Sequence, residues 1–232
     1  MKLKKFIILI ALISFTVIKA QDNCSSFYPM VEGATFTYKL YDKKDKVNGT
    51  SNYKVQEVTT NGSETIASLN INYQGSKKSE TFEMDYNFTC TGEGIRIDFN
   101  SLMPNQMVEQ YKDMDVEMDI TGTDIELPNN LSVGQELKDA DINIAMSISG
   151  MKMKVEAKTT NRKVVAQESV TTPAGTFDCM VITADILSKA MMAKVTISDK
   201  LWLAQGIGIV KQETYNKKGK LESRMELTSF SK

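Results

Sequence analysis

Apolar and polar residues alternate along most of this chain, and short runs of turn-forming residues interrupt the alternation. Residues 35–41 alternate, a polar turn follows at 42–49, and residues 51–58 alternate again. A period of two places the apolar side chains on one face of a β-strand, whereas an amphipathic helix needs a period near 3.6. The pair Asn61-Gly62 is a strong signal for a tight hairpin turn. The pattern predicts a mainly β protein with antiparallel strands.

The second half of the chain shows the same alternation with one change of phase. Apolar residues occupy even positions up to Ile148 and odd positions from Met151 onward. The serine and glycine at 149–150 permit either a hairpin turn or a β-bulge at this point. Residues 177–186 are apolar on both faces for several positions, which is typical of a strand covered on both sides.

Two segments interrupt the strand pattern. Residues 101–112 contain a proline and several helix-forming residues, so they are the candidate for a short helix. Pro128 and the two asparagines after it mark a central loop. We expect a single domain over residues 21–232, built as a strongly curved antiparallel sheet that forms a partly open barrel or clam, with one or two short helices.

The two halves of this domain are weakly similar. Residues 88–95 align with 202–209, and residues 31–33 align with 132–134. This predicts half-repeats over 21–120 and 128–232 that share one core. Chance similarity between short glycine-containing turns is the alternative, because such turns recur in all β proteins.

Residues 1–20 have the layout of a cleaved export signal. Three early lysines precede an apolar run of 13 residues, Phe6 to Ile18, and a small residue follows at Ala20. That run is shorter than the roughly 20 residues that a membrane-spanning helix needs. Asp22 and Asn23 stand before Cys24, where a lipid-anchored protein would have small residues. We expect an exported, periplasmic or extracellular protein that is neither lipid-anchored nor membrane-spanning after cleavage.

Charge and composition restrict the function classes. Residues 1–20 hold four of the 28 lysines and arginines and none of the 29 acids, so their removal leaves a net charge of −5. This balance argues against a nucleic-acid partner. The chain contains no histidine, which removes the commonest general base and the imidazole ligands of metal sites. We expect no enzyme activity and no cofactor.

Acidic and apolar residues alternate strictly over residues 113–120. On a strand this puts four carboxylates on one face, and alternate carboxylates also begin an EF-hand calcium loop. The EF-hand pattern then fails, because Met118 stands where glycine is needed and Asp124 where glutamate is needed. We interpret this row of four carboxylates as a solvated outer face of a strand or as a protected sheet edge. We expect no metal site there.

Three cysteines leave one unpaired after any pairing. Cys24 and Cys90 lie in polar surroundings, whereas Cys179 lies in an apolar run. The first two are therefore the disulfide candidates, and a bridge between them would stabilise the fold by roughly 4 kcal/mol. Three free thiols, with Cys179 buried as a small apolar residue, are the alternative.

Methionines are frequent, and some of them cluster in the second half. Thioether side chains adapt to irregular apolar ligands, so a cavity lined by methionines could accept a lipid tail. Trp202 lies on the opposite strand face from Leu201 and Leu203, where it could line a cleft or simply cap the core. Ordinary core packing is the alternative for each of these residues. The cavity candidates are Met146, Met151, Met153 and Trp202.

These features favour a non-catalytic binding module of the cell envelope that holds a lipid or another apolar ligand between curved sheets. The alternative is a structural or assembly protein that docks onto an envelope protein through its sheet edges. Two lysine-rich turns, at 43–46 and 217–220, are most simply solubilising hairpin tips, and contact with anionic lipid heads is their functional alternative.

Four segments resemble one family: CSSFYPMVEG at 24–33, LPNNLSVGQEL at 127–137, NRKVVAQESVTTPAGTFDCMVI at 161–182 and WLAQGIGIVKQETYNKKGKL at 202–221. They are similar to the TapB-like group of secreted proteins from Gram-negative bacteria, which is related to a larger domain-of-unknown-function family. The resemblance implies an envelope protein built on curved antiparallel sheets, similar to lipoprotein carriers, and gives no catalytic residues to carry over. It also places cysteines at Cys24 and Cys90, which favours pairing them.

Overall fold

The computed structural model describes residues 24–77, 80–98, 116–148, 151–190 and 193–232. Within these ranges the chain forms thirteen β-strands and no helix. The helix candidate at 101–112 lies outside the described residues. The strands are β1 (Thr35–Asp42), β2 (Val47–Asn61), β3 (Glu64–Gly75), β4 (Thr81–Cys90), β5 (Gly94–Ile97), β6 (Val116–Thr123), β7 (Ile125–Pro128), β8 (Ala140–Ile148), β9 (Met151–Thr172), β10 (Gly175–Ala190), β11 (Ala193–Ala204), β12 (Gly208–Asn216) and β13 (Leu221–Ser231).

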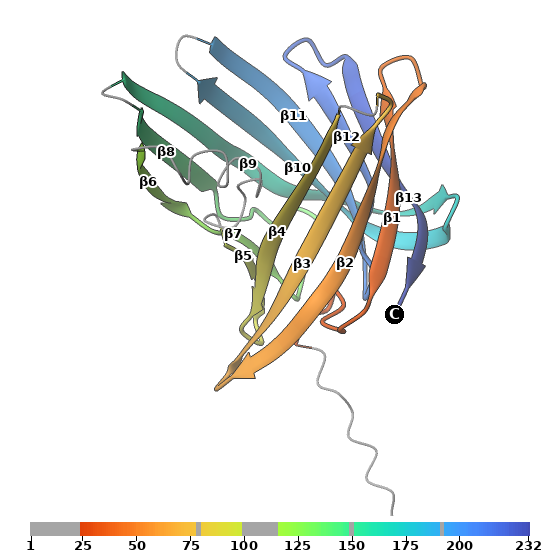
Figure 1. The fold of residues 1–232 in the computed structure, drawn as a ribbon. Coiled ribbons are helices and arrows are strands. Elements are labelled where there is room, and N and C mark those ends of the chain that lie inside the picture. The colour runs from red at the N-terminus through yellow and green to blue at the C-terminus, as the bar shows by residue number, and fades with distance from the viewer. Residues whose placement is uncertain (1–23, 78–79, 99–115, 149–150, 191–192) are drawn as a thin grey trace, which may run out of the picture.

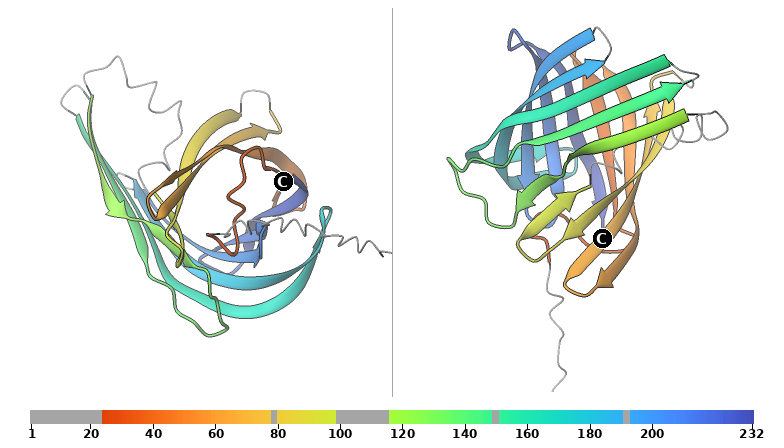
Figure 2. Two further views of the ribbon diagram at one scale, coloured as in Figure 1. Left: turned by 90° about the horizontal axis from the view of Figure 1, so that it is seen from below. Right: turned by 90° about the vertical axis from the view of Figure 1, so that its left-hand side faces the viewer.

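All thirteen strands belong to one antiparallel sheet, in the order β6-β8-β9-β10-β11-β12-β13-β1-β2-β3-β4-β5-β7. The sheet curls into a nearly closed barrel (Figures 1 and 2). The predicted curved antiparallel sheet is confirmed. The phase change predicted at 149–150 lies between two antiparallel strands, since Ile148 at the end of β8 stands opposite Met151 at the start of β9, and residues 149–150 themselves lie outside the described residues.

The barrel has one unsealed seam, between the edge strands β6 and β7. These strands are consecutive in the chain, with only Asp124 between them, yet they lie at opposite ends of the strand order. Next to the seam, Arg162 of β9 links β7 to the segment that precedes β8. Its guanidinium donates to the backbone oxygens of Lys138 (2.5 Å) and of Glu126 on β7 (2.9 Å).

The core combines aliphatic side chains from both sides of the barrel with a group of aromatic rings. The ring centres of Tyr38 and Tyr53 lie 4.8 Å apart, and Phe88 packs against Tyr28 at 4.6 Å and Tyr86 at 4.9 Å. The hydroxyl of Tyr38 donates to a backbone oxygen of Ile209 (2.9 Å), so this buried polar group is satisfied. The most deeply buried aliphatic side chains are Val55, Val164, Val181, Val210 and Leu227.

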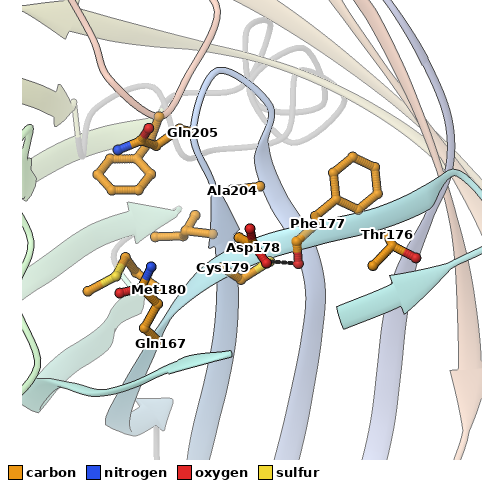
Figure 3. Close-up of a pocket in the computed structure, with 10 residues that line it drawn as sticks. Gln167, Thr176, Phe177, Asp178, Cys179, Met180, Ala204 and Gln205 are labelled. Atoms are coloured by element: carbon orange, nitrogen blue, oxygen red, sulfur yellow. Dashed lines mark hydrogen bonds between the residues drawn. The ribbon is translucent and has the colours of Figure 1, made fainter. Parts of the chain in front are cut away.

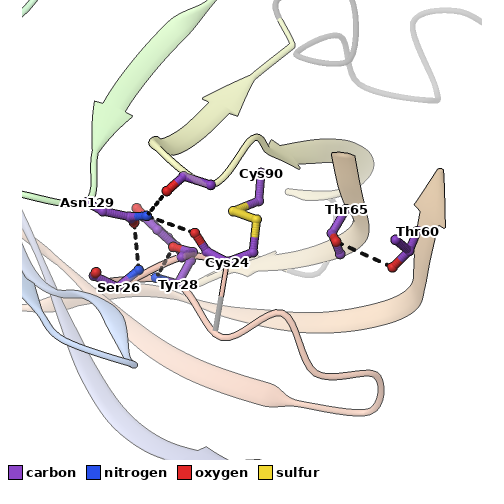
Figure 4. The surroundings of a disulfide bond; sticks show 9 residues. Cys24, Ser26, Tyr28, Thr60, Thr65, Cys90 and Asn129 are labelled. Atoms are coloured by element: carbon purple, nitrogen blue, oxygen red, sulfur yellow. Dashed lines mark hydrogen bonds between the residues drawn. A yellow bond between two sulfur atoms is a disulfide. The ribbon is translucent and has the colours of Figure 1, made fainter. Parts of the chain in front are cut away.

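Residues 24–31, which we call the N-terminal plug, close one end of the barrel. Figure 2 shows this segment, in red, inside the ring of strands when the molecule is seen from below. A disulfide joins Cys24 to Cys90 at the end of β4, with an Sγ–Sγ distance of 2.10 Å, as the sequence predicts (Figure 4). The side chain of Asn129 accepts from the backbone of Ser26 (2.7 Å) and donates to the backbone oxygen of Cys24 (2.8 Å). The plug is therefore held covalently and by buried hydrogen bonds.

Two turns of the fold have matching hydrogen bonds. Gly33 donates to the backbone oxygen of Val55 (2.9 Å), and Gly134 donates to that of Val164 (2.8 Å). In each case the valine N–H donates back to the residue after the glycine, and each glycine has a positive φ, of 83° and 93°. A residue with a side chain would be strained in that conformation. The match agrees with the aligned segments at 31–33 and 132–134, while the half-repeats as a whole stay a prediction.

Candidate functional site

The face of the sheet that forms the barrel interior can be followed from strand to strand, because paired residues on neighbouring strands share a face. Tyr38 in the core stands opposite Leu227 on β13 and Ser51 on β2. On one side this inner face continues through Met225, Gln212, Leu201, Ile182, Ile186, Thr159, Val155, Ile144 and Met146. On the other side it continues through Tyr53, Ile71, Met84 and Phe82.

Three methionines form a row on the inner face of β6, β8 and β9. Met146 stands directly opposite both Met118 and Met153 in the register, so the three thioethers are neighbours. Met146 is only 5% exposed, whereas the adjacent Ala145, which points to the other face, is exposed. A hollow of about 440 Å³ lies against these three strands and is bounded by the methionines and their chain neighbours. We call Met118, Met146 and Met153 the methionine row.

Some apolar side chains of the inner face are exposed at the end of the barrel opposite the plug. This open end carries the β1–β2, β3–β4, β8–β9, β10–β11 and β12–β13 connections (Figure 1). Phe82 at the start of β4 is 38% exposed and stacks on Tyr73, with ring centres 4.9 Å apart. Val195 at the start of β11 is 55% exposed. Large apolar residues on an inner face are normally buried, so their exposure indicates a surface that a ligand could cover.

A buried polar group lies on the inner face between the core and the open end. The carboxylate of Asp199 on β11 accepts hydrogen bonds from the hydroxyl of Thr214 (2.7 Å) and the amide of Gln212 (2.8 Å), both on β12. Desolvation raises the pKa of Asp199, and these two hydrogen bonds oppose the rise. The group is thus a satisfied polar contact on the barrel wall.

Trp202 lies apart from the methionine row. Its neighbours on β11, Leu201 and Leu203, point to the inner face, so Trp202 occupies the opposite one. It is nevertheless only 4% exposed, because the ammonium groups of Lys200 and Lys211 lie over its ring at 4.4 and 4.6 Å. Its indole N–H donates to the carboxylate of Glu168 (2.5 Å). Trp202 is a packed residue of the sheet.

A second cleft, of about 460 Å³, lies at the plugged end (Figure 3). Phe27, Met180 and Leu203 contribute apolar surface, and Gln167 and Gln205 contribute amides. Cys179 also borders this cleft, and its thiol faces the backbone oxygen of Phe177 at 3.5 Å. Burial raises the pKa of Cys179 to about 11. The thiol is therefore protonated at neutral pH and is a weak nucleophile.

The structure brings together two of the four cavity candidates from the sequence. Met146 and Met153 are adjacent, and Trp202 is not beside them. Met151 pairs with Ile148 through its backbone, and the placement of its side chain lies outside the described residues. Sequence reasoning missed Met118 and Phe82 as members of the same inner face. The sequence showed that both residues belong to alternating apolar and polar segments. It did not show which strands lie next to those segments in the barrel.

The described residues contain neither a metal-ligand cluster nor a membrane-spanning helix. No group of three or more histidine, cysteine, aspartate or glutamate side chains in the described ranges is arranged to hold a metal ion. The same ranges contain no helix that is long and apolar enough to cross a membrane.

Comparison with known proteins gives a family match and two structural relatives. The model of the DUF3108-like family matches residues 31–227. A crystal structure from Bacteroides fragilis, of a protein considered to be exported and to have a YmcC-like fold, is 23% identical, with a TM-score of 0.69 over 90% of this chain and 100% of the relative. A crystal structure from Parabacteroides distasonis, of a protein considered to be a lipoprotein, is 24% identical, with a TM-score of 0.69 over 89% of this chain and 99% of the relative. No curated protein matches the sequence.

Proposed function

This chain belongs to the DUF3108-like family, and from the geometry of its barrel we propose that it is a non-catalytic binding protein of the cell envelope. Its ligand is an apolar chain, such as a lipid acyl chain, held in the open half of the barrel interior. The observation that carries this proposal is the presence of apolar side chains on the inner face beyond the core, toward the open end. There the methionine row faces the interior and Phe82 and Val195 are exposed.

The chemistry of this wall suits an apolar chain of irregular shape. Methionine side chains are flexible and polarisable, so they can adjust to a bent or unsaturated chain. The stacked rings of Tyr73 and Phe82 supply a flat apolar surface at the mouth. A ligand that covers this surface removes it from water, which is favourable by about 25 cal/mol per Å².

The proposal assigns no catalytic step to the protein. The carboxylate of Asp199 is occupied by two hydrogen bonds from neighbouring side chains. The thiol of Cys179 is protonated at neutral pH because of its raised pKa. Holding a ligand, rather than transforming it, is what the described side chains support.

The expected localisation outside the cytoplasm supports a role in the cell envelope. Residues 1–20 predict an export signal, and the two structural relatives are considered an exported protein and a lipoprotein. Structural disulfides also form and persist mainly in oxidising compartments outside the cytoplasm. We propose a periplasmic or extracellular protein without a lipid anchor, and the finer assignment to the TapB-like group also stays a proposal.

Docking onto an envelope protein is a second candidate function, and the seam favours it. Within the described residues, β6 and β7 each pair with a single neighbour. An edge strand presents unpaired N–H and C=O groups, to which a strand of another protein can bind. Cross-linking in intact cells followed by isolation of the complex would test this role, and a stoichiometric protein partner without bound lipid would favour it.

The ligand hypothesis is tested with cis-parinaric acid, a fluorescent fatty acid, and delipidated protein. We expect a saturable rise in fluorescence. Trp202 is unsuitable as a reporter because it lies away from the methionine row. The variant Met118→Gln/Met153→Gln keeps side-chain length but adds polar groups to the inner face, and we expect its affinity to fall about tenfold.

The matched control is Lys158→Gln/Lys163→Gln, which changes two exposed lysines of β9 that lie outside the hollow and on the opposite face from Thr159 and Val164. We expect this variant to bind as the wild type does. The hypothesis is abandoned if the probe does not saturate and native mass spectrometry of freshly purified protein shows no bound lipid.

A further inference from the structure

The two lysine-rich turns of the sequence lie side by side at the open end. The β1–β2 turn carries Lys43, Lys44 and Lys46, and the β12–β13 turn carries Lys217, Lys218 and Lys220. They are neighbours because every residue of β1 pairs with β13, up to Asp42 opposite Ser223. Two contacts cross between the hairpins, from Lys43 to Glu222 (3.9 Å) and from Arg224 to Asp45 (2.7 Å).

The backbones of the two turns have the same hydrogen bonds. The Asp42 carboxylate accepts from the N–H groups two and four residues later, at 2.8 and 3.0 Å. The Asn216 side-chain oxygen accepts from the N–H groups at the same positions of its own turn, at 2.9 and 3.2 Å. The fourth residue of each turn, Asp45 or Gly219, has a positive φ, of 58° and 70°. The lysines therefore stand at equivalent places on two fixed turns, so less backbone freedom is lost when they bind.

The six turn lysines outnumber the three acids of the same two segments, 42–46 and 216–222. Within the described part of the chain, no carboxylate lies within 4.0 Å of the ammonium groups of five of the six turn lysines, Lys44, Lys46, Lys217, Lys218 and Lys220. All of them are exposed. The neighbouring β10–β11 hairpin adds the exposed Lys194, while its other exposed lysine, Lys189, pairs with Glu156 at 3.5 Å. A chain whose residues after 20 carry a net charge of −5 thus concentrates positive charge at one end.

Exposed apolar residues accompany these lysines. Val47, directly after the first lysine turn, is 52% exposed, and Phe82 and Val195 are exposed at the same end. Acids occur at both ends: Asp42, Asp45 and Glu222 accompany the six turn lysines at the open end, whereas the loops of the plugged end carry the exposed acids Glu32, Glu93, Glu136, Asp139 and Asp178 without a comparable lysine turn. Cationic side chains interspersed with apolar ones are suited to a surface of anionic headgroups with acyl chains beneath it.

We propose that the open end docks onto an anionic lipid bilayer through these two lysine turns. The turn lysines contact the headgroup phosphates, and Val47, Phe82 and Val195 face the acyl boundary. The mouth of the barrel then lies against the membrane, with the acidic, plugged end directed away. This docking goes beyond the proposed ligand site and stands whether or not the barrel interior holds a lipid.

Vesicle sedimentation tests the proposal. The mature protein is mixed with vesicles of phosphatidylcholine alone or of equimolar phosphatidylcholine and phosphatidylglycerol. We expect binding only to the second, and we expect it to weaken sharply between low salt and about 0.3 M NaCl, where the Debye length is shorter. Neutralising four turn lysines, in Lys44→Gln/Lys46→Gln/Lys217→Gln/Lys218→Gln, is expected to lower the partition coefficient at least about tenfold.

The matched control removes the same charge elsewhere, in Lys54→Gln/Lys138→Gln/Lys163→Gln/Lys232→Gln. We expect it to retain most of the binding. Equal loss in both variants, equal binding to pure phosphatidylcholine, or no binding to either vesicle would overturn the proposal. Competition by soluble glycerol phosphate would also overturn it, since it would indicate a site for a free headgroup. The cis-parinaric acid titration reports separately on the barrel interior, so failure of one proposal is distinguishable from failure of the other.

Discussion

Trp202 shows how a large aromatic residue is accommodated on the outer side of a sheet. The ammonium groups of two lysines lie over its ring, and its only polar atom donates to Glu168. The lysine stems exclude water while their ammonium groups interact with the π-system. The single tryptophan is thus explained by packing.

For Trp202→Phe we expect a loss of about 1–3 kcal/mol in the free energy of unfolding, because the variant loses ring area and leaves Glu168 without its indole donor. Urea denaturation followed by circular dichroism measures this loss. Glu168→Gln keeps an acceptor oxygen for the indole and is expected to cost less. A change within error for Trp202→Phe would show that the ring is not needed for stability.

Asp199 and Asp185 are two carboxylates of β11 and β10 with opposite pKa shifts. Desolvation raises the pKa of Asp199, whereas hydrogen bonds from Ser198 and then Asn161 lower that of Asp185. A raised pKa in the folded state favours the protonated form, so the contribution of Asp199 to stability falls as the pH rises above its unfolded value near 4. The contribution of Asp185 is present above that value and is lost as the pH falls through the lowered pKa.

We therefore expect Asp199→Asn to be as stable as the wild type or up to about 1 kcal/mol more stable at pH 7, with the difference shrinking toward pH 4. Asp185→Asn is the matched control and is expected to be less stable at pH 7, with its deficit shrinking at acidic pH. Urea denaturation at several pH values measures both. A marked destabilisation by Asp199→Asn at pH 7 would contradict the desolvation account.

At the scale of elements, the N-terminal plug depends on a bond to a distant strand. The disulfide spans 66 residues of sequence, and the plug also reaches the β11–β12 turn, where Gly206 donates to the backbone oxygen of Ser26 (2.8 Å). The segment before β1 therefore connects β4 to the opposite side of the barrel. It closes one end of the interior and leaves the other end open.

Replacing both bonded cysteines, in Cys24→Ser/Cys90→Ser, is expected to cost roughly 4 kcal/mol, since the bridge restricts the unfolded chain. Urea denaturation with and without dithiothreitol measures this cost, and the reductant should lower the wild type to the level of the variant. Cys179→Ala is the control and should keep the sensitivity of the wild type to reductant. A wild type that is unaffected by reductant would contradict the stabilising role of the bridge.

At the scale of the whole molecule, the barrel has two unlike ends. One end is filled by the plug and carries acidic loops, and the other exposes apolar side chains among lysines. The single-sheet topology produces this polarity, because alternate connections of an antiparallel barrel lie at the same end. Lysine turns that are far apart in the chain thereby become neighbours, and the proposed ligand site and membrane contact meet at one mouth.

Local properties of the sequence determined much of this protein. The alternation of residues 35–41 or 142–148 depends only on the geometry of a strand, so the antiparallel β class and the hairpins could be predicted. The disulfide could be anticipated because Cys24 and Cys90 lie in polar surroundings and Cys179 does not. The four methionine and tryptophan residues stay candidates for a ligand cavity; the structure places Met146 beside Met153 and Trp202 away from both.

Only the tertiary structure decided how these elements close into a barrel. Strand order, the seam between β6 and β7, and the plugged end all depend on pairings between distant segments, and a period of two carries no information about partners. For the same reason the sequence showed Phe82 and Met118 as apolar strand residues but not as two walls of one interior. The lysine turns at 43–46 and 217–220 were visible as separate hairpin tips, and the pairing of β13 with β1 made them one surface.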